Sequence, residues 1–126
     1  MVDTKTIISK IQNGLKSCAE QHNIVAKDVQ LKILPSGKVD LWNADKLIGP
    51  IDVCKTFKIS AMENMLFPIG PYLKKALASL AKKKNVDPEI AVARIFTKQA
   101  DYSPCVYFQE GDKIISEITI DELLKI

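Results

Sequence analysis

The chain has 126 residues and a net charge of +3, with 47% hydrophobic and 26% charged residues. This length and composition indicate a folded protein with its own core and exclude a largely disordered chain. No apolar run approaches the ~20 residues of a membrane-spanning helix, and the first residues lack the apolar core of a signal peptide.

No linker-like segment divides the sequence, so we expect a single compact domain over residues 1–126. We also expect that this domain has no membrane partner and is not secreted. Its expected location is the cytoplasm, or a virion in which it would be a component.

The three cysteines, Cys18, Cys54 and Cys105, form no Cys-x-x-Cys pair, and His22 is the only histidine. This spacing indicates reduced thiols, not a disulfide framework or a zinc site. His22 follows Cys18 by four residues, as a base might follow a nucleophile on a helix, but the apolar surroundings predicted for Cys18 disfavour a thiolate. We therefore predict no metal, no cofactor and no enzymatic activity.

Apolar residues at helical spacing predict a helix over residues 4–22, which Asn23 would end. Gly14 weakens this helix, so we expect another element to pack closely there. Alternation then predicts strands near residues 29–33 and 39–42, joined as a hairpin by a Pro-Ser-Gly turn.

Even spacing of apolar residues predicts a third strand over residues 51–59, after a turn-rich break, which would complete an antiparallel meander. The pattern Ser60-x-x-Glu63 is a capping box and predicts a short helix that Pro68 ends. A longer helix is predicted over residues 71–84.

A further helix is predicted over residues 90–96, although Ile90, Val92 and Phe96 also fit a strand. The chain would end with a second hairpin over residues 105–119 and a short helix over residues 121–126. Because helices and strands occupy separate parts of the sequence, the expected fold class is α+β: an N-terminal helix, a three-stranded antiparallel meander, a helical middle, a C-terminal β-hairpin and a short terminal helix.

Positive charge is concentrated between Glu63 and Asp87, where the chain has no acidic residue and five lysines. The lysines are Lys74, Lys75, Lys82, Lys83 and Lys84. The rest of the chain carries a net charge of −2. One interpretation is a solvated helix face whose last lysines complement the helix dipole. The other is a docking face for phosphates or acidic partners, favoured because a face built only for solubility usually mixes both signs.

Residues 71–119 would place helix, turn, helix and hairpin in an order that resembles the winged-helix DNA-binding pattern. The resemblance implies that the second helix reads bases, but this helix offers only Arg94 and Lys98 and begins with acidic residues. Base reading relies on Arg, Asn and Gln, and Arg94 is the only arginine of the chain. What remains is non-specific phosphate contact through the five lysines, Arg94 and Lys98.

Four apolar residues are candidates for contact with a partner: Trp42, Met62, Met65 and Phe67. Methionines beside an aromatic ring make an adaptable contact surface where they are exposed. Trp42 lies on the polar side of its predicted strand, so it is a contact residue if that side is exposed and a core residue if a helix covers it.

The C-terminal part has the opposite charge, because residues 99–126 carry a net charge of −4. A basic helix and an acidic end could orient two copies head to tail. The leading hypothesis is a non-enzymatic protein-interaction or structural assembly protein, which binds another protein or its own copies. The alternative is a nucleic-acid-binding domain that contacts phosphates through residues 71–98.

Overall fold

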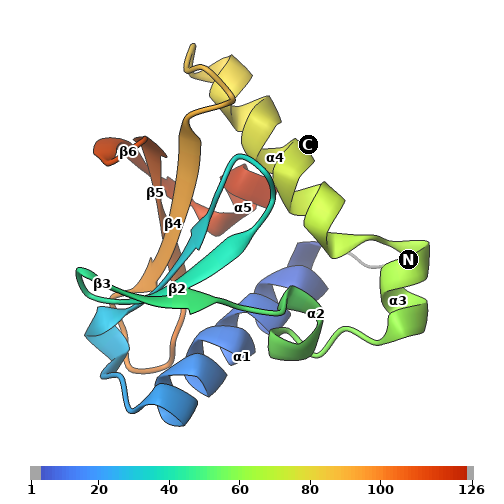
Figure 1. Cartoon of the computed structure of the whole chain (residues 1–126), viewed down its shortest axis with the longest axis vertical. Helices are drawn as coiled ribbons and strands as arrows, with labels where there is room; N and C mark the ends of the chain where they lie inside the picture. Colours follow the sequence, from blue (N-terminus) through green and yellow to red (C-terminus); the bar gives the residue numbers. More distant parts are fainter. Residues whose placement is uncertain (1–3, 125–126) are drawn as a thin grey trace.

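The computed structural model describes residues 4–124 and shows a mixed helix-and-strand fold, which confirms the α+β class (Figure 1). The strands are β1 Val29–Ile33, β2 Val39–Asn43, β3 Lys46–Pro50, β4 Ala91–Thr97, β5 Pro104–Glu110 and β6 Lys113–Thr119. The helices are α1 Thr4–His22, α2 Val53–Thr56, α3 Ala61–Leu66, α4 Ile69–Lys83 and α5 Ile120–Leu124, with a 3₁₀ turn at Ala26–Asp28.

The six strands form one antiparallel sheet in the order β3-β2-β1-β4-β5-β6. The three N-terminal strands form the predicted kind of meander, and the three C-terminal strands form a second one. The two meanders join where β1 pairs with β4, with Leu31 opposite Ile95. The first strand of the chain is therefore in the middle of the sheet.

The N-terminal helix and its close approach are both as predicted. Ile11 and Leu15 are buried on one stripe of α1, and Asn23 follows its last residue with a left-handed φ of 54°. A Cβ atom added to Gly14 would lie only 2.5 Å from the ring of Phe57, which is itself 3% exposed. Glycine at this position lets the segment after α2 pack directly onto α1.

The prediction of a strand over residues 51–59 is wrong. The third strand, β3, follows β2 after a tight two-residue turn, in which Ala44 has a φ of 52°. The even spacing of Val53 and Phe57 belongs instead to the helical turn α2, where the Asp52 carboxylate accepts a hydrogen bond from the Lys55 N–H at 3.1 Å.

The prediction of a helix over residues 90–96 is also wrong, because this segment forms β4. The Asp87-Pro88 pair makes a turn in which the Asp87 carboxylate accepts a hydrogen bond from the Glu89 N–H at 2.9 Å. The chain then pairs with β1 on one side and with β5 on the other. The segment between α4 and the last hairpin is thus a central strand, so the helix-turn-helix unit of the winged-helix pattern is not formed.

The remaining predicted elements are confirmed within the described residues. Ser60 and Glu63 form the capping box of α3, and α4 follows after Pro68. The C-terminal hairpin is present as β5 and β6, and the Thr119 hydroxyl accepts a hydrogen bond from the N–H of Glu122 in α5 at 3.1 Å. The last two residues of the predicted terminal helix, 125 and 126, lie outside the described residues.

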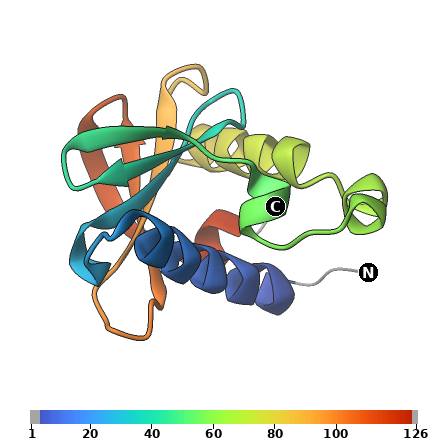
Figure 2. The same ribbon diagram turned by 60° about the horizontal axis from the view of Figure 1, so that its bottom comes forward.

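Three helices cover one side of the sheet. Helix α1 packs on β1 and β5, α4 packs on β4 and β1, and α5 packs on β5 and β6 (Figure 2). The core lies between these helices and the sheet, and its strand residues include Leu31, Leu41, Ile95 and Phe108, each at most 1% exposed. Since side chains alternate along a strand, the intervening residues point to the other side.

Candidate functional site

The side of the sheet without helices, called the open face here, has a different composition from the core side. Its central side chains are Lys32 on β1, Trp42 on β2, Arg94 and Phe96 on β4, and Tyr107 on β5. Gln30, Asp40, Gln109 and Glu117 lie on the same face. None of the helices described between residues 4 and 124 packs on it. Aromatic rings, positive charges and amides thus share one surface, which the helices described for residues 4–124 leave uncovered.

Two positive charges face each other in the middle of this surface. Lys32 on β1 is paired in register with Arg94 on β4, and like charges directly opposite each other repel. Lys32 Nζ lies 3.9 Å from the centroid of the Trp42 ring, and Arg94 Cζ lies 4.9 Å from the centroid of Tyr107. Neither cation forms an ion pair within 4.0 Å with any described carboxylate. Each cation instead lies over an aromatic ring, and on its other side Lys32 is paired in register with Asp40 of β2.

The Tyr107 ring, over which Arg94 lies, also stacks on a second aromatic ring of the open face. Phe96 and Tyr107 have centroids 4.4 Å apart and an interplanar angle of 23°. Beside them, Lys98 Nζ lies 2.7 Å from a carboxylate oxygen of Glu117 on β6, and this hydrogen bond raises the pKa of Lys98. Tyr107 is half-buried and Phe96 is buried, so Phe96 supports the ring that reaches the surface.

The open face also contains most of the unsatisfied polar atoms. Within residues 4–124, six buried side-chain nitrogen or oxygen atoms have no hydrogen-bond partner, and five of them belong to this face. The five atoms are Gln30 Oε1, Asp40 Oδ1, Trp42 Nε1, Arg94 Nε and Gln109 Oε1. Buried polar groups normally have partners. Most of the unpaired buried side-chain atoms among the described residues therefore lie on the open face.

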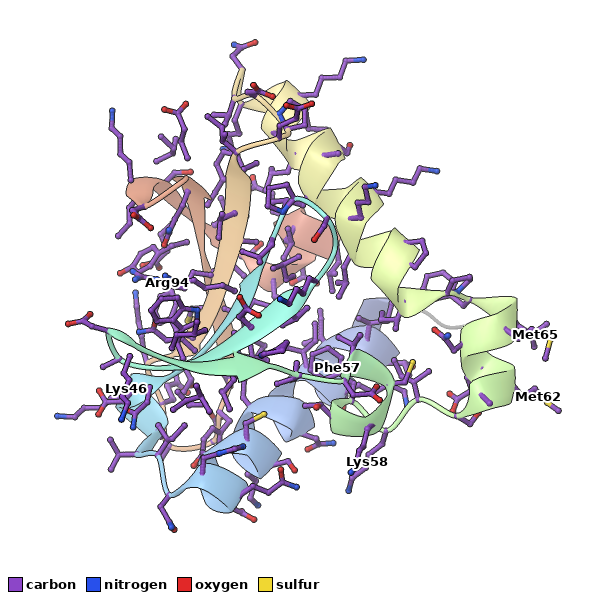
Figure 3. All side chains as sticks on the ribbon, in the orientation of Figure 1. Lys46, Phe57, Lys58, Met62, Met65 and Arg94 are labelled. Carbon is purple, nitrogen blue, oxygen red and sulfur yellow. The ribbon has the colours of Figure 1, made fainter. Side chains whose placement is uncertain are left out.

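A second surface is the exposed side of α3, called the methionine patch here. It consists of Met62, Met65 and Leu66, which are 69%, 75% and 81% exposed. Figure 3 shows Met62 and Met65 pointing away from the rest of the molecule. Of the predicted contact residues, Met62 and Met65 are thus exposed, whereas Phe67 is half-buried and packs against Tyr72 with ring centroids 4.7 Å apart.

The lysine-rich segment does not form one surface with Arg94 and Lys98. Helix α4 lies on the covered side of the sheet, while Arg94 points to the open face (Figure 3). Lys83 and Lys84 also share a groove with Asp121 and Glu122 of α5. The basic helix end and the acidic C-terminal end are therefore neighbours within one molecule, which reduces their ability to orient two copies head to tail.

The Cys18–His22 pair has the arrangement of structural residues. The Cys18 thiol is buried and its burial raises its pKa, whereas His22 is exposed at the end of α1. A neutral buried thiol is a poor nucleophile. Within residues 4–124, no group of three His, Cys, Asp or Glu side chains is placed to hold a metal ion.

In the same range, the helices all lack the length or the apolar character that a bilayer-spanning segment needs.

The sequence indicated part of this site. Trp42 was identified as a residue of the polar strand side, but Lys32, Phe96 and Tyr107 were not identified as contact residues. The alternative interpretation of residues 90–96 as a strand would have indicated Phe96. In a strand, Ala93 and Ile95 form the core side, while Arg94 and Phe96 share the opposite side. No family model, curated protein or solved structure matches this chain.

Proposed function

We propose that the protein is a non-enzymatic protein-interaction module that takes its partner on the methionine patch of α3. The observation that carries this proposal is the exposure of three neighbouring large apolar side chains, Met62, Met65 and Leu66, at 69%, 75% and 81%. Single exposed apolar residues are common, whereas an exposed cluster on one short helix is typical of a contact site. Methionine side chains adapt their shape to a partner.

The position of α3 supports this proposal, since several contacts hold the helix in place. Its first turn has a capping box, in which the Ser60 N–H donates to the Glu63 carboxylate at 3.0 Å. After its last turn, the Asn64 side chain accepts a hydrogen bond from the N–H of Ile69 at 3.0 Å, and Phe67 packs against the core. A helix fixed in this way presents its apolar side to a partner without a large ordering cost.

The surrounding charge indicates the chemistry of the partner. The one carboxylate of α3, Glu63, lies 3.8 Å from Lys10 Nζ, which balances its charge. The following residues, 64–86, contain no acidic residue, and Lys74 and Lys75 are exposed on α4 in this stretch. An acidic surface with an apolar centre complements this combination. The occupant proposed here is a different protein, because the acidic end of this chain already lies beside its own Lys83 and Lys84.

A photocrosslinking amino acid in place of Met65, introduced in the producing cells, tests this proposal. We expect adducts with a partner that has an acidic, apolar-centred surface, and none of these adducts from a crosslinker at Ile114, an equally apolar residue that is 47% exposed on β6. With the purified partner, the variant M62S/M65S/L66S should bind at least about tenfold more weakly, as expected when contact residues at the centre of an interface are removed.

Three outcomes contradict the proposal. The first is an adduct pattern that is the same at positions 65 and 114. The second is partner binding that survives the triple serine substitution. The third is a crosslinked product made only of two copies of this chain, together with a dimer in light scattering, which would make the partner a second copy.

A further inference from the structure

We propose that the open face binds single-stranded nucleic acid, with bases stacked on Trp42 and Tyr107 and phosphates held by Lys32 and Arg94. This site is separate from the methionine patch, and the inference does not depend on the function proposed for α3. It rests on charge, on aromatic surface and on unsatisfied hydrogen-bonding groups that meet on one side of the sheet.

The first step of the argument is the charge. Arg94 is the only arginine of the chain, and in the middle of the sheet it is opposite another cation, Lys32, which on its other side is opposite Asp40 of β2. Its Nε is buried without a hydrogen-bond partner, and it makes no ion pair with a described carboxylate. A guanidinium is the side chain best shaped to hold a phosphate through two hydrogen bonds. A phosphate between Arg94 and Lys32 would also remove their mutual repulsion.

The second step is the aromatic surface on either side of these cations. Trp42 on β2 and Tyr107 on β5 are separated by three strand spacings, which is about 14 Å. At present Lys32 and Arg94 lie over these two rings. Cation–ring contacts at partly exposed sites are weak enough to be exchanged. When the cations move to phosphates, the ring faces become free to stack with bases.

The third step is the set of polar atoms without partners. The Gln109 side chain is only 2% exposed, and while its amide nitrogen donates to the Gly111 carbonyl at 2.9 Å, its Oε1 has no partner. Gln30 Oε1 and Trp42 Nε1 are likewise unpaired on the same face. Base edges carry both hydrogen-bond donors and acceptors. When Lys32 and Arg94 move away from the rings to bind phosphates, the bases of the bound strand can form hydrogen bonds with these unpaired side-chain atoms.

The shape of the site favours a single strand over a duplex. Recognition in the major groove uses an inserted helix or β-ribbon, and the segment predicted to supply a reading helix is the central strand β4. Stacking on protein side chains requires bases that are not already stacked within a duplex. The lysines of α4 lie on the other side of the sheet and are not part of this site.

The test uses the full chain and a fluorescein-labelled oligothymidylate or oligouridylate of about 15 nucleotides, a length that fits the site sizes of sheet-based single-strand binders. Anisotropy measures binding, and a second reporter is built in because Trp42 is the only tryptophan. We expect both strands to bind at low salt and to quench Trp42 emission, and their relative affinities separate RNA from DNA. Two to three phosphate contacts with a single strand predict a log–log salt slope of about −1.4 to −2.1.

Two charge variants locate the site. K32Q/R94Q should weaken binding at least about tenfold, whereas K74Q/K75Q, which removes the same charge from α4, should leave it within about twofold. W42A should also weaken binding about tenfold, and W42F should restore much of it, because phenylalanine still stacks. Circular dichroism and thermal unfolding establish that each variant is folded, and the quenching of Trp42 in the unmodified chain does not depend on any variant.

The inference is overturned if neither anisotropy nor Trp42 emission changes at low salt, or if a duplex of equal length binds as tightly as the single strand. Loss of binding in K74Q/K75Q in place of K32Q/R94Q would move the site to α4. If polyglutamate quenches Trp42 as strongly as the oligonucleotide does, the open face binds acidic protein surfaces instead. The methionine-patch variant M62S/M65S/L66S should bind the strand normally, so the two proposals can fail separately.

Discussion

The two sides of the sheet come from the same strands but have different roles. On the covered side, Leu31 and Ile95 are at most 1% exposed and pack beneath α1 and α4. On the open face, the neighbouring residues Lys32 and Arg94 lie against aromatic rings and have no carboxylate partner within 4.0 Å among the described residues. Alternation along a strand lets one side maintain the fold while the other side remains free for contact.

The difference also appears in how polar groups are satisfied. On the covered side, the Tyr72 hydroxyl donates a 2.6 Å hydrogen bond to the Leu124 carbonyl, which links α4 to α5. On the open face, five buried side-chain atoms have no hydrogen-bond partner within the described chain. Unsatisfied buried groups reduce stability, so we expect the open face to contribute less to folding than the covered side does.

The largest expected effect comes from two adjacent residues of β1 that point to opposite sides. L31A should lower the free energy of unfolding by about 2–5 kcal/mol, because it leaves a cavity in the core. K32A, one residue away, should lower it by less than about 1 kcal/mol. Urea unfolding followed by circular dichroism measures both, and equal losses would show that the two sides do not differ as described.

A smaller loss is expected where α1 meets the segment after α2, which tests how tightly the covered side is packed. G14A places a methyl group 2.5 Å from the Phe57 ring, and this overpacking should exceed the gain in helix propensity, for a net loss of about 1–2 kcal/mol. Gly70 in α4 is the comparison, because an added Cβ there meets nothing within 4 Å apart from its chain neighbours, of which Pro71 disfavours a helical residue with a Cβ before it. G70A gains helix propensity but meets the Pro71 ring, so its loss should be smaller than that of G14A. A loss as large as that of G14A would show that contact with Phe57 is not the cause.

Substitution of one tyrosine on each side of the sheet compares how much their hydroxyl groups contribute to the free energy of unfolding. Y72F removes the hydrogen bond to the Leu124 carbonyl and should cost about 1 kcal/mol in the free energy of unfolding. Y107F on the open face keeps the ring contacts and should change the stability by less than about 0.5 kcal/mol. Thermal unfolding of both variants measures the difference, and a larger loss for Y107F would show that the open face contributes more to folding than its contacts indicate.

The smallest expected effect concerns α3, which belongs to neither side of the sheet. Hydrogen bonds from the Ser60 N–H and from the Ser60 hydroxyl, and beside them the charge of Lys10, hold the pKa of Glu63 below its ordinary value of 4.5, and S60A removes the hydroxyl contribution. Because the pKa is lowered in the folded state, the capping box stabilises α3 above the ordinary pKa, and this contribution is lost as the pH falls through the folded pKa. An NMR titration should show the Met62 and Met65 methyl signals shifting with this pKa. S60A should raise the pKa, and an unchanged titration in S60A would contradict the role of the cap.

Several elements could be predicted from local patterns alone. The apolar stripe of α1, its end at Asn23 and the capping box of α3 each depend on residues within a few positions of one another. The same holds for the two hairpins, whose turns lie next to alternating segments. These predictions are confirmed because each element depends mainly on residues that are close together in the sequence.

The third strand and the central strand could not be assigned in this way. Residues 46–50 form a strand because a two-residue turn aligns them with β2, not because of their own composition. Residues 91–97 fit a helix or a strand locally, and pairing with both β1 and β5 decides for the strand. Pairing over such separations is a tertiary effect, which a local pattern does not contain.

Composition and local spacing were enough to predict the fold class, the charge asymmetry and the candidate contact residues Trp42, Met62 and Met65. Which of them are exposed depends on how the chain folds in three dimensions, and the fold also places the lysines of α4 and Arg94 on opposite sides of one sheet. The physical reason is the sheet order, in which β1 lies between β2 and β4. This order places Trp42, Lys32, Arg94 and Tyr107 on one face although they are far apart in the chain.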